Sequence, residues 1–147
     1  MSKRLPAEPR SAFPHFVEIT TRWNDNDSYR HVNNAVYYEY FDTVVNQFLI
    51  EKRALDVERS GIIGLVVETQ CQFFSQIAFP SKVHAGLRVA HLGNSSVRYE
   101  IGIFSDDQMT ASAQGHFVHV YVDRTNSRPM PLPHDLKDAL APLLTSP

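Results

Sequence analysis

The chain has 147 residues, a formal net charge of −2 and 43% hydrophobic residues, which fits one domain with a real core. This charge balance gives no argument for binding nucleic acid or an acidic membrane surface. Cys71 is the only cysteine, so an internal disulfide is impossible, as is typical of a reducing compartment. No apolar run reaches membrane-spanning length, and the N-terminus lacks the apolar segment of a secretory signal. We therefore expect a soluble, cytoplasmic protein.

The first expected element is a strand that follows a loose tail. Residues 1–13 contain two prolines among mixed charges and predict a loose N-terminal tail, and residues 14–147 are expected to form a single domain. Residues 15–23 alternate between apolar and polar side chains, with one face made of Val17, Ile19, Thr21 and Trp23. This alternation predicts a strand with that face buried.

The stretch from residue 24 to residue 40 reads NDNDSYRHVNNAVYYEY and holds the most suggestive chemistry. It begins with two acids, Asp25 and Asp27, and continues to Asn33 or Asn34, either of which can cap a helix with its side-chain oxygen. A helix N-terminus presents unpaired N–H groups and a partial positive charge, so it can stabilise an oxygen that becomes negative. An acid beside such a donor supplies two parts of a hydrolytic site. Asp and Asn also cluster before helices for capping alone, and we expect Asp25 to be such a turn residue.

Residues 35 to about 53 show helical spacing. Two adjacent apolar stripes recur every four residues, and they consist of Val36, Tyr40, Val44 and Phe48 with Tyr37, Phe41, Val45 and Leu49 beside them. Together the stripes predict one long helix with a wide apolar surface, which has to pack across a sheet.

The rest of the chain is dominated by strand patterns. Further strands are expected at residues 65–73, 83–89, 97–103 and 109–122, and a short amphipathic helix at residues 135–144. In the first of these strands one face consists of Leu65, Val67, Thr69, Cys71 and Phe73. The turns between the last strands are too short for crossover helices, so the strands are expected to be antiparallel. The fold class is therefore α+β.

A strand, a helix and four strands, with DNDSYRHVNN ahead of the helix, resemble the hotdog-fold acyl-CoA thioesterases of the 4-hydroxybenzoyl-CoA thioesterase-like family. The motif of that family reads roughly Asp-x-Asp-x-x-Gly-His-Val-Asn-Asn, and the resemblance extends over about residues 14–144. It implies a long central helix wrapped by an antiparallel sheet of about five strands. It also implies a homodimer or homotetramer with active sites at the subunit interface.

The same resemblance implies roles for individual residues of the motif. The catalytic acid of the family falls on Asp27, acting as general base on water or as nucleophile on the thioester carbonyl. The oxyanion donor falls on the backbone N–H of Asn34. His31 and Asn33 match the His-Val-Asn part and shape that turn, and we count His31 with the catalytic residues and Asn33 with those that bind substrate.

One position of the motif departs from the family pattern. Arg30 stands where the family has glycine, so it either takes an ordinary backbone conformation or strains the turn. It also offers a positive charge for the thioester or the CoA phosphates.

Tyr37 is expected to line an acyl channel. The turn at residues 93–96 is neutral where some relatives carry a basic cluster for the CoA nucleotide, which leaves the nucleotide site open.

Other histidine, glutamate and cysteine side chains are weaker candidates for a catalytic or metal site. His116 and His119 are three apart on one predicted strand, so they point to opposite faces and cannot share a metal ion. Glu68 is a second, weaker candidate for a catalytic carboxylate. The alternative is that it is a solvated glutamate or one at the rim of a dimer. Cys71 is expected to pack as a small apolar residue, because no base is predicted beside it. We expect no metal and no other cofactor.

The sequence therefore predicts an acyl-CoA thioesterase that hydrolyses its substrate to a free acid and CoA. The partner expected is acyl-CoA, with neither nucleic acid nor membrane. Two alternatives remain open. One is a non-catalytic protein of the same fold that binds acyl thioesters. The other is an acyl-CoA hydratase, for which His31, four residues after Asp27, would complete an Asp/His dyad.

Overall fold

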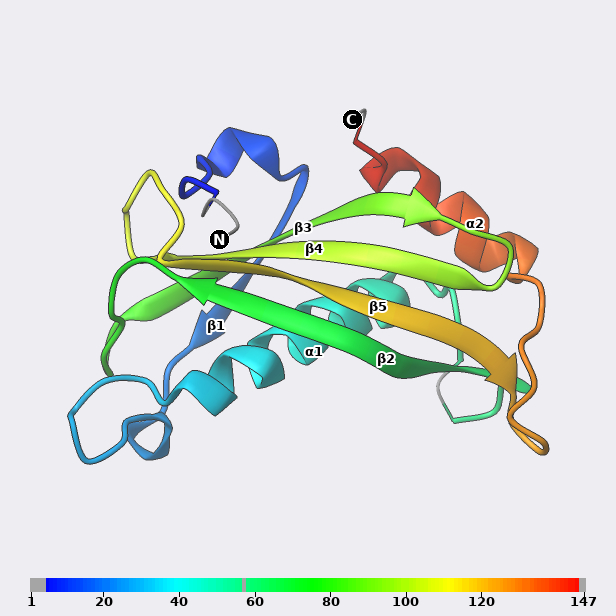
Figure 1. The fold of residues 1–147 in the computed structure, drawn as a ribbon, viewed down its shortest axis with the longest axis horizontal. Helices are drawn as coiled ribbons and strands as arrows, with labels where there is room; N and C mark the ends of the chain where they lie inside the picture. The colour runs from blue at the N-terminus through cyan, green and yellow to red at the C-terminus, as the bar shows by residue number, and fades with distance from the viewer. Residues whose placement is uncertain (1–4, 57, 146–147) are drawn as a thin grey trace.

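The computed structural model describes residues 5–56 and 58–145. Its elements are β1 (His15–Thr20), α1 (Asn34–Glu51), β2 (Ile62–Phe73), β3 (Lys82–Leu92), β4 (Ser96–Ser105), β5 (Ala113–Asp123) and α2 (His134–Leu140), with short 3-10 turns at Arg10–Ala12, Trp23–Asp25 and Ala141–Leu143. The strands form one five-stranded sheet in the order β1-β3-β4-β5-β2, and every neighbouring pair is antiparallel (Figure 1). The predicted α+β class and the antiparallel sheet are confirmed.

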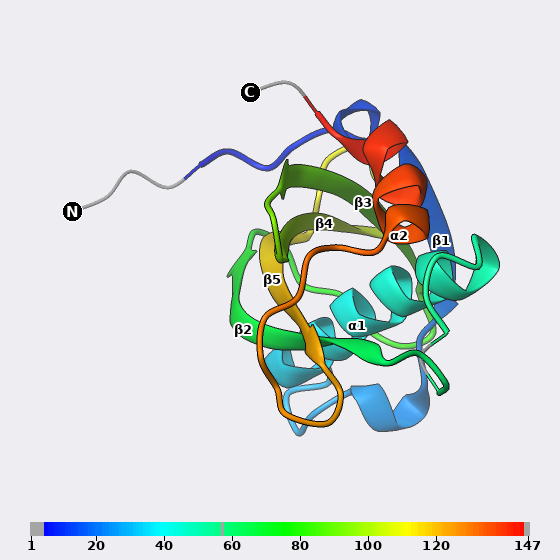
Figure 2. The same cartoon turned by 90° about the vertical axis from the view of Figure 1, so that its right-hand side faces the viewer.

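The sheet curves around α1, which lies against its concave face (Figure 2). The helix has 18 residues, which corresponds to a length of about 27 Å, and α2 adds only a short second helix at the edge near β3. The side chains that α1 buries are Tyr37, Tyr40, Phe41, Val44, Val45, Phe48 and Leu49. These are the predicted stripes, apart from Val36, which is only partly buried. Within residues 5–56 and 58–145, neither helix combines the length and the apolar character needed to cross a membrane.

Two strands leave apolar side chains exposed to solvent. β1 ends at Thr20, and Trp23 lies beyond it in a 3-10 turn with 76% of its surface exposed. β2 is an edge strand, paired on one side only, with β5. Its Leu65, Val66 and Val67 are exposed, Val67 to 60%. The burial of β2 does not alternate, and its pairing with β5 is irregular between Val66 and Glu68. An edge strand leaves one side of its backbone and much of its side-chain surface uncovered.

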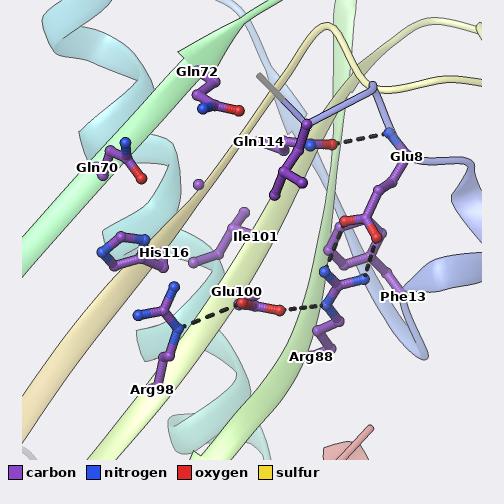
Figure 3. A pocket seen from close by; sticks show the side chains of 12 residues that line it. Glu8, Phe13, Gln70, Gln72, Arg88, Arg98, Glu100, Ile101, Gln114 and His116 are labelled. Carbon is purple, nitrogen blue, oxygen red and sulfur yellow. Dashed lines mark hydrogen bonds and ion pairs between the residues drawn. The ribbon is translucent and has the colours of Figure 1, made fainter. Parts of the chain in front are cut away.

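The described part of the N-terminal segment, residues 5–13, is attached to the outer face of the sheet, which differs from the loose tail that we expected. Phe13 lies over Gly86 and Gly102, and a Cβ on Gly102 would come within 2.6 Å of its ring. Glu8 accepts a 2.7 Å ion pair from Arg88, which also donates to Glu100 at 2.8 Å (Figure 3). Glycines in the strands therefore make room for an aromatic anchor. Residues 1–4 lie outside the described part of the chain.

Candidate functional site

The loop before α1 is a tight hairpin. The Asp27 N–H donates to the His31 carbonyl at 2.9 Å, and the Arg30 N–H donates to the Asp27 carbonyl at 2.9 Å. Asn26 and Val32 pair as an isolated antiparallel bridge. This pattern corresponds to a three-residue loop, in which a turn is followed by one residue in the left-handed region. The hairpin fixes the backbone around Asp27.

Arg30 is the residue that takes the left-handed conformation, with φ of 67°. That region favours glycine, because a side chain there crowds the backbone. Arg30 therefore strains the turn and does not take an ordinary backbone conformation. The loop keeps the geometry that a glycine would allow and adds an exposed guanidinium.

Replacing Arg30 with glycine is expected to stabilise the fold. The left-handed conformation costs an L-residue about 1–2 kcal/mol, and the greater freedom of glycine in the unfolded chain offsets roughly 0.5–1 kcal/mol. We expect Arg30→Gly to raise the free energy of unfolding by roughly 0.5–1 kcal/mol in urea titrations. Arg30→Ala keeps the Cβ and should give no gain, so an equal gain in both variants would show that backbone strain is not the cause.

Asp25 is a buried structural carboxylate, 1% exposed. It accepts bonds from the Arg22 backbone N–H at 2.9 Å, the Arg22 guanidinium at 2.9 Å and the Tyr40 hydroxyl at 2.9 Å. Burial acts to raise its pKa, but the bonds from Arg22 and Tyr40 outweigh burial and hold the pKa below its usual value. Asp25 therefore ties the loop to α1, in agreement with its expected turn role.

Asp27 lies differently, in the wall of a pocket. One of its carboxylate oxygens, Oδ1, accepts the Tyr29 backbone N–H at 2.8 Å. Within residues 5–56 and 58–145, Oδ2 accepts no hydrogen bond. A carboxylate oriented through one oxygen, with the other free, can accept a proton or attack a carbonyl.

The N-terminus of α1 opens into the same pocket. Asn33 is the N-cap, and its Oδ1 accepts the Ala35 N–H at 2.9 Å. The Asn33 N–H donates to the Asp25 carbonyl at 2.9 Å, which anchors the cap to the loop. The Asn34 N–H has no acceptor among the described residues. An unpaired donor at a helix N-terminus is the arrangement that stabilises a developing oxyanion.

The pocket has a volume of about 380 Å³ and is lined by Asp27, Tyr29, His31, Val32, Asn34, Tyr37, Phe73, Phe74, Ser75 and Gln76. The structure thus brings together four of the residues singled out by sequence, namely Asp27, His31, Asn34 and Tyr37. Burial raises the pKa of Tyr37 to about 12, so its hydroxyl stays protonated. The wall is mostly apolar and aromatic, which suits an acyl group.

Residues 74–76 follow the end of β2 and complete this wall, and the amino-acid sequence offered no reason to assign them a role. Phe73, the last residue of β2, was expected only on one face of a strand. The Val32 N–H donates to the Ile77 carbonyl at 2.7 Å, and the Asn26 side chain accepts the Phe79 N–H at 3.0 Å. These two bonds hold the segment after β2 against the acidic loop. No local sequence signal marks such a long-range pairing.

The other candidate residues lie elsewhere. Asn33 serves as the helix cap, and Arg30 lines a second pocket, which shares Asp27 with the first. The Glu68 carboxylate lies 2.8 Å from His116 Nε2 on the outer face of the sheet, away from Asp27. Burial raises the pKa of Cys71 to about 12, which leaves an unreactive thiol.

His116 and His119 point to opposite faces of β5, as the alternation predicts. His116 lines the outer pocket, while His119 lines a cavity of about 180 Å³ between α1 and the sheet. Within the described residues, no three His, Cys, Asp or Glu side chains form a group that could hold a metal ion.

Comparison with known proteins places this chain in a family. A family model described as the thioesterase-like superfamily matches residues 21–140. The structure of the PA5185 protein from Pseudomonas aeruginosa strain PAO1 is similar at 52% identity, with a TM-score of 0.94 over 96% of this chain and 99% of that one. The PA2801 protein of Pseudomonas aeruginosa, a proposed thioesterase, is similar at 29% identity, with a TM-score of 0.79 over 86% of this chain and 98% of that one.

A more distant relative matches only in part. The YsmA protein of Bacillus subtilis (strain 168) is 22% identical over 90 residues, which cover 61% of this chain and 60% of that protein. The family model, by contrast, spans the acidic loop, α1 and the four strands β2 to β5. With its antiparallel sheet curved around one helix, the chain therefore belongs to the thioesterase-like superfamily of hotdog-fold proteins.

Proposed function

We propose that this protein hydrolyses an acyl-CoA thioester to a free acid and CoA, with Asp27 as base or nucleophile. One observation carries the proposal: Asp27 has a carboxylate oxygen and Asn34 an N–H without a partner among the described residues, and both residues line the same pocket. The apolar wall formed by Val32, Tyr37 and Phe73 would hold the acyl group.

The proposed chemistry needs both groups. In the general-base form, Asp27 takes a proton from water, and the hydroxide oxygen bonds to the thioester carbon. The carbonyl oxygen becomes an oxyanion that the Asn34 N–H stabilises. Collapse of this intermediate breaks the C–S bond, and the leaving thiolate takes the proton from Asp27. In the nucleophilic form, an Asp27 oxygen bonds to the carbon first, and water then hydrolyses the resulting anhydride.

The choice of a CoA thioester is suggested by the name of one protein with the same fold. Gentisyl-coenzyme A thioesterase BH1999 shares the fold, with a TM-score of 0.75 at 21% identity over 86% of this chain. That likeness concerns the fold alone, so the acyl group stays open. A thiol-release assay over short, medium, long and aryl CoA esters tests the proposal. Binding without thiol release from any ester would favour the non-catalytic alternative.

The hydratase alternative has no specific support in the geometry. A hydratase would use Asp27 and His31 as a dyad, but no side-chain bond joins them within the described residues, and the His31 Nδ1 is buried without a partner. Hydration of an enoyl-CoA, followed by loss of ultraviolet absorbance, would distinguish this activity from hydrolysis.

We also propose that the protein is a homodimer or a homotetramer built through β2. The free edge of β2 exposes unpaired backbone groups beside Leu65, Val66 and Val67. An apolar edge strand of this kind is suited to pairing with a second copy about a two-fold axis. Such pairing would cover the exposed side chains and extend the sheet across both subunits.

A charge in the middle of β2 is expected to separate the subunits. Val67→Glu would place two like charges at the paired edge, and we expect the dimer to weaken on the order of 100-fold or more. Light scattering at micromolar concentration should then give a mass near the 16.7 kDa of one chain. Met109→Glu is the matched control, because Met109 is an exposed apolar residue away from β2. A wild-type mass of one chain would contradict the proposal itself.

A further inference from the structure

A second pocket shares Asp27 with the acyl pocket and is lined by residues of the loop before α1 and by Phe79. Figure 1 shows this loop at the N-terminal end of α1. The volume of the pocket is about 610 Å³, and its lining residues are Trp23, Asn24, Asn26, Asp27, Arg30 and Phe79. This lining combines aromatic rings, side-chain amides and a guanidinium. We propose that the pocket binds the nucleotide of the thiol leaving group, the adenosine 3′-phosphate 5′-diphosphate of CoA. The inference rests on the proposed function and assigns its substrate to CoA rather than to a carrier protein.

Trp23 supplies the stacking surface. The indole is 76% exposed and meets the ring of Phe79 edge-on, at 5.9 Å between centroids and 83° between planes. An edge-on neighbour leaves an indole face available to a base. Aromatic side chains bind bases through such stacking without regard to sequence. An exposed tryptophan with a free face is therefore suited to the adenine ring.

The backbone beneath Trp23 is anchored to α1 through Asp25, which places the indole at the pocket before a ligand arrives. Trp23 begins a 3-10 turn that ends at Asp25. The buried Asp25 carboxylate binds both Arg22 and the Tyr40 hydroxyl of α1. Pre-organisation of this kind lowers the entropic cost of binding.

Arg30 supplies the positive charge. Its guanidinium is exposed and makes no ion pair among the described residues. The left-handed backbone at φ of 67° sets the direction in which the side chain leaves the loop. A guanidinium recognises phosphate through paired N–H donors. Asn26, oriented by accepting the Phe79 N–H at 3.0 Å, keeps its amide NH₂ to donate.

Asp27 connects this pocket to the acyl pocket, because it lines both. A molecule with its acyl group in one pocket and its nucleotide in the other would pass its thioester beside the Asp27 carboxylate. The neutral turn at residues 93–96 offers no alternative charge for phosphate. The second pocket thus fits the part of the substrate that the acyl pocket leaves unbound.

The first test uses the fluorescence of Trp23, which is the single tryptophan of the chain. Titration with adenosine 3′,5′-bisphosphate and with CoA is expected to quench this fluorescence to saturation. Phosphopantetheine and inorganic phosphate, which have no base, should leave it nearly unchanged. The proposal is overturned if the nucleotide does not bind, or if calorimetry detects binding while the fluorescence stays constant.

The second test compares two substrates with the same acyl group, one on CoA and one on pantetheine. Loss of stacking is expected to raise KM for acyl-CoA by about 10- to 100-fold in Trp23→Ala, with circular dichroism confirming the fold. The preference for acyl-CoA over acyl-pantetheine should fall by the same factor, and Trp23→Phe should restore most of it. Arg30→Ala should also reduce the preference, whereas the exposed Arg128, in the loop after β5, gives the matched control Arg128→Ala.

Failure of the nucleotide-binding proposal can be distinguished from failure of the proposed hydrolase function. If no thioester is hydrolysed, the hydrolase assignment fails, and the fluorescence titration still decides whether the nucleotide binds at Trp23. If acyl-CoA and acyl-pantetheine are hydrolysed with equal KM, or if Trp23→Ala raises both KM values equally, the nucleotide does not occupy this pocket.

Discussion

Asp27→Asn is expected to lower kcat for thioester hydrolysis by about 10²–10⁴, the usual contribution of a positioned general base. Asparagine has nearly the shape of aspartate and can still accept the Tyr29 N–H that orients Asp27 at 2.8 Å. It can neither accept the proton of water nor attack the carbonyl. The apolar wall and the Asn34 N–H stay in place, so the variant should still bind acyl-CoA. Steady-state kinetics and calorimetry on the same preparation measure both quantities.

Asp25→Asn is the matched control for this experiment. Asp25 is the buried carboxylate that binds Arg22 and Tyr40, so its substitution should reduce stability by about 1–3 kcal/mol and affect kcat far less. Asp27→Asn should therefore fold normally but not hydrolyse the substrate. Asp25→Asn should still hydrolyse the substrate but melt at a lower temperature. Retention of more than about a tenth of kcat in Asp27→Asn, or a greater loss in Asp25→Asn, would contradict the assignment.

Acid is expected to destabilise the protein through His119. This imidazole is 5% exposed, packed among the rings of Tyr99, Phe117 and Tyr121, and its Nε2 has no hydrogen-bond partner among the described residues. Burial lowers the pKa of His119 from 6.5 to about 4. A charged imidazole would be costly in these surroundings, because nothing beside it compensates the charge.

The sign of the effect follows from the two pKa values. At pH 7 His119 is neutral in both the folded and the unfolded chain, so the fold suffers no penalty. As the pH falls below 6.5, the unfolded chain binds a proton that the folded chain does not, and stability decreases until the pH reaches about 4. Because one pKa unit corresponds to about 1.4 kcal/mol, this group should remove roughly 3 kcal/mol over that range.

His119→Phe isolates this contribution. Phenylalanine keeps an aromatic ring in the cavity and cannot be protonated, so the variant should lose less stability on acidification than the wild type. Urea titrations at pH 7 and pH 4.5 give the two differences, and groups common to both proteins, including His15, cancel. Parallel pH dependence in the two proteins would show that His119 does not bear the acid sensitivity.

Features that depend on local periodicity can be predicted from the amino-acid sequence alone. The stripes of α1 follow from helical spacing, and Asn33 caps the helix because its short side chain reaches the Ala35 N–H. The antiparallel pairing of β3, β4 and β5 follows from the shortness of their connections. An acid beside a helix start is also a local pattern, but the choice of Asp27 and Asn34 within it came from the resemblance of DNDSYRHVNN to the family motif.

Burial of these patterns, in contrast, depends on which distant segments meet in the folded chain. The alternation of β2 is the same whether a strand is central or at an edge, and its pairing with β5 alone leaves Val67 exposed. Asp25 and Asp27 are identical in type and two residues apart, yet Tyr40 and Arg22 enclose only the first. The residues after β2 enter the site through bonds across more than forty positions. Local sequence does not encode such contacts, because each of them needs two segments that only the packing of the whole sheet against α1 brings together.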